Sequence, residues 1–162
     1  MTVRENLEIG GFTAERRETG RRLDCVLDVF PRLRDHLTRR AGDLSGAQQQ
    51  MTAVGRGLMS KPRLLVLDEP LMGLAPAVAS DLAHVLQSIV DSGELSVLLI
   101  EQRAFEVVDI CERAYLLDLG VITDDSALES MTAGNESSLY FTGAASSPAC
   151  ASRAEGQREE EG

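Results

Sequence analysis

The chain has 162 residues, of which 43% are hydrophobic and 26% charged; this is typical of a globular domain and excludes wholesale disorder. The net charge of -10 is uneven, because residues 1–63 carry 12 basic and 8 acidic side chains whereas residues 64–162 carry 4 basic and 18 acidic ones. No stretch approaches the roughly 18 apolar residues that span a bilayer, and the start of the chain lacks a signal-peptide pattern, so a soluble cytoplasmic protein is expected.

The first 43 residues are expected to be helical. One helix face is apolar at the i, i+3, i+4 and i+7 positions, which are Leu23, Val26, Leu27 and Phe30. Pro31 then ends the segment. Arginine pairs such as Arg16-Arg17 could form a nucleic-acid surface, but acidic residues lie among them and aromatic residues do not. We interpret them as a solvated helix face and expect no nucleic-acid partner.

A sharper pattern begins at Ser45. It predicts a helix from Ser45 to about Met59, which Lys61-Pro62 stops. The apolar run Leu64–Leu67 follows and predicts a strand buried on both faces, as in parallel sheets. This strand closes on Asp68-Glu69.

The next predicted helix has one apolar face, made of Val78, Leu82, Val85, Leu86, Ile89 and Val90. It ends before Gly93, and a second buried strand at Val97–Ile100 closes on Glu101-Gln102. Strands that alternate with helices predict an α/β fold with parallel strands.

The remaining predicted elements are shorter. They are a helix at Phe105–Cys111, a third strand at Ala114–Leu117 and a tight turn at Gly120. Beyond Gly143 the chain is rich in Ala, Ser, Gly and Glu, which predicts a disordered tail.

Cysteine and histidine offer no metal or disulfide framework. Cys25, Cys111 and Cys150 are far apart without C-x-x-C spacing, so they are expected to be free thiols. His36 and His84 have no partner at metal-ligand spacing.

The first candidate for chemistry is the helix start at Ser45-Gly46. A helix N-terminus exposes unpaired N–H groups that favour an anion, and the serine hydroxyl adds a donor. Serine also begins many helices for purely structural reasons, so this motif alone does not decide between the two roles.

The second candidate is the acidic pair at the end of the first predicted strand. Parallel sheets bind ligands at the carboxyl ends of their strands, where Asp68 could orient Mg²⁺ and Glu69 could accept a proton from water. The alternative is a strand that merely ends on two solvated acids.

Together, the spacing of these motifs resembles the ATP-binding subunits of ABC transporters, most closely the branched-chain amino-acid (or urea and amide) uptake subfamily. The phrases that carry the resemblance are Pro31-Arg-Leu33, Arg40-Ala-Gly-Asp-Leu-Ser-Gly46, Gln49-Gln-Met51, Leu67-Asp-Glu-Pro70, Gly73-Leu-Ala-Pro76 and Ile100-Glu-Gln102. It implies part of the P-loop NTPase fold of an ABC ATPase, with a helical subdomain followed by parallel strands that alternate with helices.

The resemblance also implies roles for individual residues. The signature motif, which contacts ATP held by the opposite subunit, falls on Ser45, Gly46, Ala47 and Gln48. Asp68 corresponds to the Walker B acid that orients Mg²⁺, Glu69 to the catalytic base and Gln102 to the switch residue. The implied partners are a second ABC ATPase subunit and transmembrane permease subunits, which would place the protein at the inner face of the cell membrane.

The implied organisation has three parts: a helical subdomain at residues 1–60, the Walker B, D-loop and switch part at 61–142, and a disordered acidic tail at 143–162. The family's phosphate loop, G-x-x-x-x-G-K-[ST], is absent, because the only lysine is Lys61 and the residue immediately before it is Ser60 rather than glycine. Ala47 replaces a signature glycine and Leu71 replaces a D-loop hydroxyl residue.

These departures predict a truncated ABC-type ATPase that cannot bind or hydrolyse ATP alone. We also expect unpaired strand edges and an exposed apolar sheet face, because the resemblance implies further strands. One alternative is a non-catalytic module that donates a signature motif to a complete ATPase. A second alternative, the head segment of a chromosome-maintenance ATPase, is disfavoured because residues 1–43 show no sustained heptads.

Overall fold

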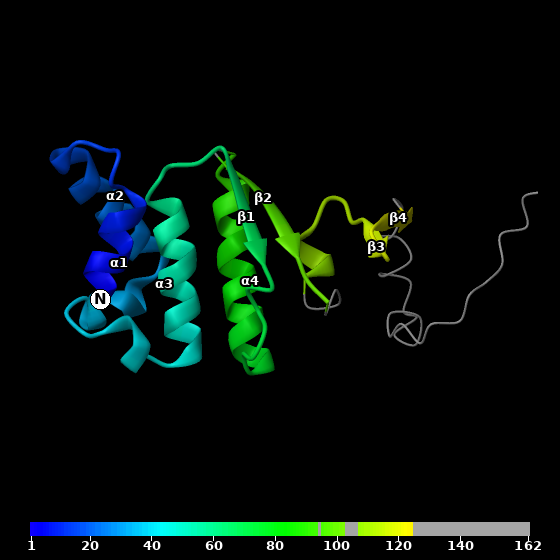
Figure 1. Ribbon diagram of the computed structural model, residues 1–162, viewed down its shortest axis with the longest axis horizontal. Coiled ribbons are helices and arrows are strands. Elements are labelled where there is room, and N and C mark those ends of the chain that lie inside the picture. The colour runs from blue at the N-terminus through cyan, green and yellow to red at the C-terminus, as the bar shows by residue number, and fades with distance from the viewer. Residues whose placement is uncertain (94, 103–106, 125–162) are drawn as a thin grey trace, which may run out of the picture.

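The computed structural model describes residues 1–93, 95–102 and 107–124. Its N-terminal part is helical, as expected (Figure 1). The three α-helices there are α1 (Val3–Gly10), α2 (Arg16–Val29) and α3 (Gly46–Leu58). Two 3-10 helices, η1 (Pro31–His36) and η2 (Ala41–Asp43), connect α2 to α3.

Two of these helices, α1 and α3, begin with a capping box. The Thr2 hydroxyl accepts a hydrogen bond from the Glu5 N–H, and the Glu5 carboxylate accepts one from the Thr2 N–H. Those bonds hold the pKa of Glu5 below its ordinary value, because they favour the ionised carboxylate. Ser45 and Gln48 form the equivalent capping box on α3.

Glycine allows α1 and α3 to lie unusually close. A Cβ atom on Gly10 would sit 2.0 Å from the carbonyl oxygen of Arg56. A Cβ atom on Gly55 would sit 2.9 Å from Val26 Cγ1 and 3.0 Å from Leu7 Cδ2. The three helices therefore pack through backbone as well as side chains, which fixes the position of α3.

The middle of the chain forms the predicted parallel unit. Strand β1 (Leu64–Asp68), helix α4 (Pro76–Asp91) and strand β2 (Ser96–Ile100) follow in order. The two strands pair in parallel, in a register that runs from Leu64 beside Ser96 to Asp68 beside Ile100. Gly93, with φ +75°, provides the turn after α4.

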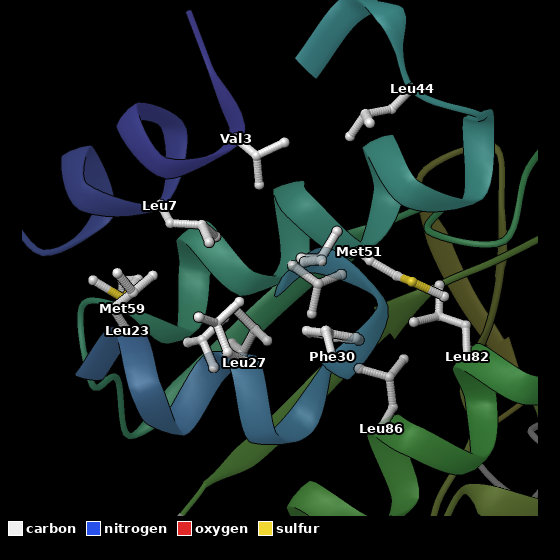
Figure 2. Packing of buried hydrophobic residues seen from close by; sticks show 14 of the residues in the cluster. Val3, Leu7, Leu23, Leu27, Phe30, Leu44, Met51, Met59, Leu82 and Leu86 are labelled. Atoms are coloured by element: carbon white, nitrogen blue, oxygen red, sulfur yellow. The ribbon is translucent and has the colours of Figure 1, made fainter. Parts of the chain in front are cut away.

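One apolar cluster joins the helical part to the α4 unit. Figure 2 shows Met51 of α3 pointing toward Leu82 of α4, with Phe30 and Leu86 beside them. Because the core is shared, α3 and the β1–α4–β2 unit are held in a fixed relation.

Within the described residues, the β1–β2 sheet is covered on one face only. Leu65 is buried, and Leu67, Val97 and Leu99 pack partly buried against the core. The alternate positions remain half-exposed: Leu64 at 55%, Val66 at 54%, Leu98 at 49% and Ile100 at 46%. This confirms the expected exposed apolar face. The prediction that the strands at Leu64–Leu67 and Val97–Ile100 are buried on both faces was wrong, because the core packs against one face of this sheet.

The predicted tight turn at Gly120 is confirmed, whereas the third strand is displaced from the predicted Ala114–Leu117 and does not join the parallel sheet. Strand β3 is Leu116–Asp118, and it pairs antiparallel with β4 (Val121–Asp124) in a separate two-stranded sheet. The reason is the two-residue turn between them, in which Leu119 (φ 46°) and Gly120 (φ 82°) both have positive φ. Such a turn matches the twist of a hairpin, so it joins β3 to β4.

The remaining expectations concern short or undescribed segments. Only the 3-10 helix η4 (Val108–Ile110) stands in the described part of the predicted helix at Phe105–Cys111. The predicted tail at 143–162 lies outside the described residues. No helix in the described ranges is long and apolar enough to cross a membrane.

Candidate functional site

The start of α3 leaves a hydrogen-bond donor of Ser45 available. Its Oγ accepts a hydrogen bond from the Gln48 N–H (3.4 Å), and its backbone N–H donates to Gln48 Oε1 (3.2 Å). Since Oγ acts as an acceptor in the cap, its proton can still be donated to an anion. Ser45 and Gly46 are exposed, and a Cβ atom on Gly46 would meet nothing within 4 Å.

The N–H groups of the first turn of α3 provide further hydrogen-bond donors beside the Ser45 hydroxyl. Gly46 and Ala47 precede the first residues that can donate within the helix, so their N–H groups point outward from its N-terminus. Gln48 was predicted to belong to the same signature motif, but its side chain accepts a hydrogen bond from the Ser45 N–H in the capping box. The S-x-x-Q pattern was the signal that could have predicted this role.

The end of β1 places the acidic pair next to β2. Asp68 is exposed, and no hydrogen bond or ion pair from another described residue engages its carboxylate. Glu69 is half-buried and has φ +47°, a left-handed conformation that is uncommon for residues other than glycine. Its backbone N–H continues the ladder by donating to the Ile100 carbonyl oxygen at 2.8 Å.

Gln102 and Glu69 meet directly, although they lie 33 positions apart in the sequence. The Gln102 side-chain Nε2 donates a hydrogen bond to Glu69 Oε1. The bond leaves the other carboxylate oxygen free to accept a proton, and it orients the carboxylate. The structure therefore brings together the two residues predicted at the ends of neighbouring strands.

A third residue of this cluster was missed as a functional candidate. Glu101 Oε1 accepts a hydrogen bond from the N–H of Leu71 at 2.9 Å. Leu71 lies in the turn after β1, where the Met72 N–H also donates to the Glu69 carbonyl oxygen at 3.1 Å. The contact spans 30 positions, so no local spacing rule could have found it.

Asp68 is the residue at the end of β1 that could hold a magnesium ion together with phosphate. Within the described part of the chain, no three His, Cys, Asp or Glu side chains are grouped as metal ligands. Mg²⁺ is commonly held by one or two carboxylates together with substrate phosphates. Asp68, with its unengaged carboxylate at the end of a strand, suits that role.

The two candidate regions are not joined directly. Among the described residues, no hydrogen bond or ion pair links the helix start at Ser45 to Asp68, Glu69 or Gln102. Ser45 and the pair of Glu69 and Gln102 therefore form two chemical surfaces that no hydrogen bond of the described residues connects.

Other reactive side chains do not extend the site. Lys61 is exposed, has φ +55° and lies between α3 and β1, outside any glycine-rich loop. Cys25 and Cys111 are free thiols, and burial raises the pKa of Cys111, so it stays a thiol at neutral pH. Cys150 lies outside the described residues.

Comparison with known sequences gives consistent matches. A profile described as ABC transporter matches residues 1–72. The chain is 39% identical over 144 residues to the high-affinity branched-chain amino acid transport ATP-binding protein BraG of Pseudomonas aeruginosa, covering 88% of this chain and 61% of BraG. It is also 39% identical over 120 residues to a probable branched-chain amino acid transport ATP-binding protein, LivF, of Archaeoglobus fulgidus, covering 74% of this chain and 51% of LivF.

Comparison with solved structures agrees. A crystallised ATP-binding cassette of an ABC transporter superposes with a TM-score of 0.72 at 26% identity, over 87% of this chain and 63% of that structure. The fold is therefore part of an ABC ATPase domain of the P-loop NTPase class. The chain spans between about half and two thirds of the length of the proteins it matches.

Proposed function

The chain belongs to the family of ABC transporter ATP-binding proteins, and we propose that it serves an importer of branched-chain amino acids. The solute class rests on the two relatives at 39% identity, both named for branched-chain amino acid transport. Its partners would be a second ATP-binding subunit and the permease subunits, which would hold it at the inner face of the membrane.

The observation that carries the proposal is the contact between Gln102 and Glu69. A carboxylate and an amide from the ends of two paired parallel strands lie where α/β folds bind their ligands. A strand that merely ended on solvated acids would have no need for this cross-strand bond. The bond thus favours a catalytic role for Glu69 over the alternative of two solvated acids at the end of a strand.

In this proposal each residue has one task. Bound Mg²⁺-ATP would supply the phosphoryl group and its charge neutralisation. Asp68 would hold the magnesium ion, with ATP phosphates as the other ligands. Glu69 would accept a proton from the attacking water, and Gln102 would keep its carboxylate oriented. Ser45, Gly46 and Ala47 would donate hydrogen bonds to phosphate held by the opposite subunit.

The first test concerns ATP binding by this chain alone. Its 162 residues contain no G-x-x-x-x-G-K-[ST] loop, so we expect no heat of binding when Mg²⁺-ATP is titrated into the purified protein. Isothermal titration calorimetry makes the measurement. Micromolar affinity would contradict the prediction that this chain cannot bind ATP alone.

The second test separates the capping role of Ser45 from its phosphate role. Asp caps helices as well as Ser, but its charge would repel phosphate, so Ser45→Asp should keep the urea midpoint and lose function. The assay mixes this chain with a complete ABC ATP-binding relative whose own signature serine is replaced. Wild-type chain should raise ATP turnover at least about tenfold, equivalent to ~1.4 kcal/mol, and the variant should not. Equal turnover with both chains would exclude Ser45 as a phosphate donor.

The same mixture tests the alternative of a non-catalytic partner that only donates the signature motif. The exposed helix start with its available Ser45 hydroxyl favours that alternative, because it needs no second site on this chain. Glu69→Gln distinguishes the two proposals. Turnover should fall further with Glu69→Gln if this chain is catalytic, and stay at the wild-type level if it only donates Ser45.

A further inference from the structure

We propose that Glu101 is a positioning residue that fixes the direction of Glu69 by holding the turn after β1. The inference rests on the proposed function only in giving Glu69 a role toward nucleotide. The structural part of it, the dependence of the turn on Glu101, stands independently.

Three consecutive residues at the end of β2, of which Ile100 is the last residue of the strand, hold the two ends of this turn. The Ile100 carbonyl oxygen accepts from the Glu69 N–H, and the Gln102 side chain donates to the Glu69 carboxylate. Between them, Glu101 Oε1 accepts from the Leu71 N–H at 2.9 Å. Backbone and side chain of Glu69 are thus each held by one neighbour of Glu101, and the following turn is held by Glu101 itself.

The turn needs such a restraint because its first residue is strained. Glu69 has φ +47°, which a side chain with a Cβ atom adopts only when the surroundings enforce it. Pro70 comes next and has no N–H, so Leu71 carries the first backbone donor of the turn after Glu69. An acceptor at that donor fixes the path of the chain immediately beyond the strained residue.

The site of this hydrogen bond is largely shielded from water. Leu71 is 1% exposed, and Glu101 is half-buried. Loss of the acceptor of a buried backbone N–H destabilises the folded protein, because water cannot easily replace the bond. A carboxylate acceptor makes the bond stronger than a neutral carbonyl would.

The test measures hydrogen exchange of the Leu71 amide by NMR in the full chain. Glu101→Ala should speed its exchange at least about tenfold, since a hydrogen bond to a charged group is lost. Glu101→Gln, which keeps an Oε1 acceptor, should restore most of the protection. Glu112→Ala removes an exposed carboxylate from the same part of the chain and should leave Leu71 unchanged.

A measurement on the wild-type protein covers the case in which Glu101→Ala does not fold. The bond predicts a scalar coupling between the Leu71 amide nitrogen and the Glu101 side-chain carboxyl carbon. Detection of that coupling supports the inference. Its absence, or unchanged Leu71 exchange in a folded Glu101→Ala protein, overturns it.

Turnover in the mixture with a complete relative supplies the catalytic readout. Glu101→Ala should lower kcat at least about tenfold with little change in the KM for ATP, and Glu101→Gln should recover it, because Glu69 is misdirected rather than removed. If Glu69→Gln lowers turnover and Glu101→Ala leaves it unchanged, the positioning role is excluded. If Leu71 exchange responds and no variant affects turnover, the positioning of the turn stands and the proposed function fails.

Discussion

At the scale of single residues, Lys61 shows a backbone conformation that its side chain does not favour. It has φ +55°, and Pro62, the next residue in the chain, restricts its backbone further. A residue with a Cβ atom costs about 1–2 kcal/mol in a left-handed conformation, which glycine adopts freely. We therefore expect Lys61→Gly to stabilise the protein by ~0.5–1 kcal/mol, seen as a higher urea midpoint.

The control for that change is Lys61→Ala. It removes the same charge but keeps the Cβ atom, so the urea midpoint should stay near the wild-type value. Equal stabilisation by both variants would assign the effect to charge, and no gain with glycine would contradict the backbone explanation.

At the scale of elements, the contact between α1 and α3 depends on Gly10. A Cβ atom there would lie 2.0 Å from the Arg56 carbonyl oxygen and 3.0 Å from Met59 Cβ, so the helices would have to move apart. Gly10→Ala should lower the free energy of unfolding by at least ~1–3 kcal/mol, as overpacking does. Chemical denaturation followed by circular dichroism measures it.

Gly20 provides a matched control on the neighbouring helix. It lies inside α2, and a Cβ atom there would meet nothing within 4 Å. Gly20→Ala should raise the free energy of unfolding by ~0.5–1 kcal/mol, because alanine is the better helix former. Opposite signs for the two substitutions are the expected result, and a loss of stability in both would argue against steric contact as the cause.

At the scale of the whole molecule, the open face of the β1–β2 sheet sets how the protein behaves in solution. Val66 and Leu98 lie side by side on that face and are each about half exposed. Exposed apolar patches bind apolar dyes and partners. The double variant Val66→Thr, Leu98→Thr should reduce dye fluorescence with little change in the melting temperature.

Leu65, on the covered face of β1, is the contrasting position. It is 7% exposed, so Leu65→Thr should lower the free energy of unfolding by ~2 kcal/mol or more through lost burial and an added hydroxyl. A double variant on the open face that destabilised the protein to the same extent would show that this face is buried in solution.

The sequence was informative where structure follows from local patterns. The apolar runs at Leu64–Leu67 and Val97–Ile100 predicted the positions of β1 and β2, but not that one face of the sheet is exposed. The helix start at Ser45 was predicted from its capping residue. The sequence placed Glu69 and Gln102 after two parallel strands, and the pairing of those strands in the structure brings the two side chains together.

What the sequence did not predict depends on backbone geometry and long-range contact. The left-handed φ of Glu69 has no local signal, since neither glycine nor asparagine occupies the position. The bond from Leu71 to Glu101 depends on where β2 ends relative to β1, which is a tertiary property. The tight turn at Gly120 was predicted, but the left-handed φ of the neighbouring Leu119 was not.

Lys61 also has a practical consequence, because it is the only lysine in 162 residues and its side chain is exposed at the joint between α3 and β1. An amine-reactive fluorophore or cross-linker would therefore attach to one side chain of the whole protein, besides the terminal amine. The label would stand between the helical part, with Ser45, and the strand part, with Glu69. It would make the protein a single-site optical reporter of any change in the surroundings of that joint when a partner subunit and nucleotide are added.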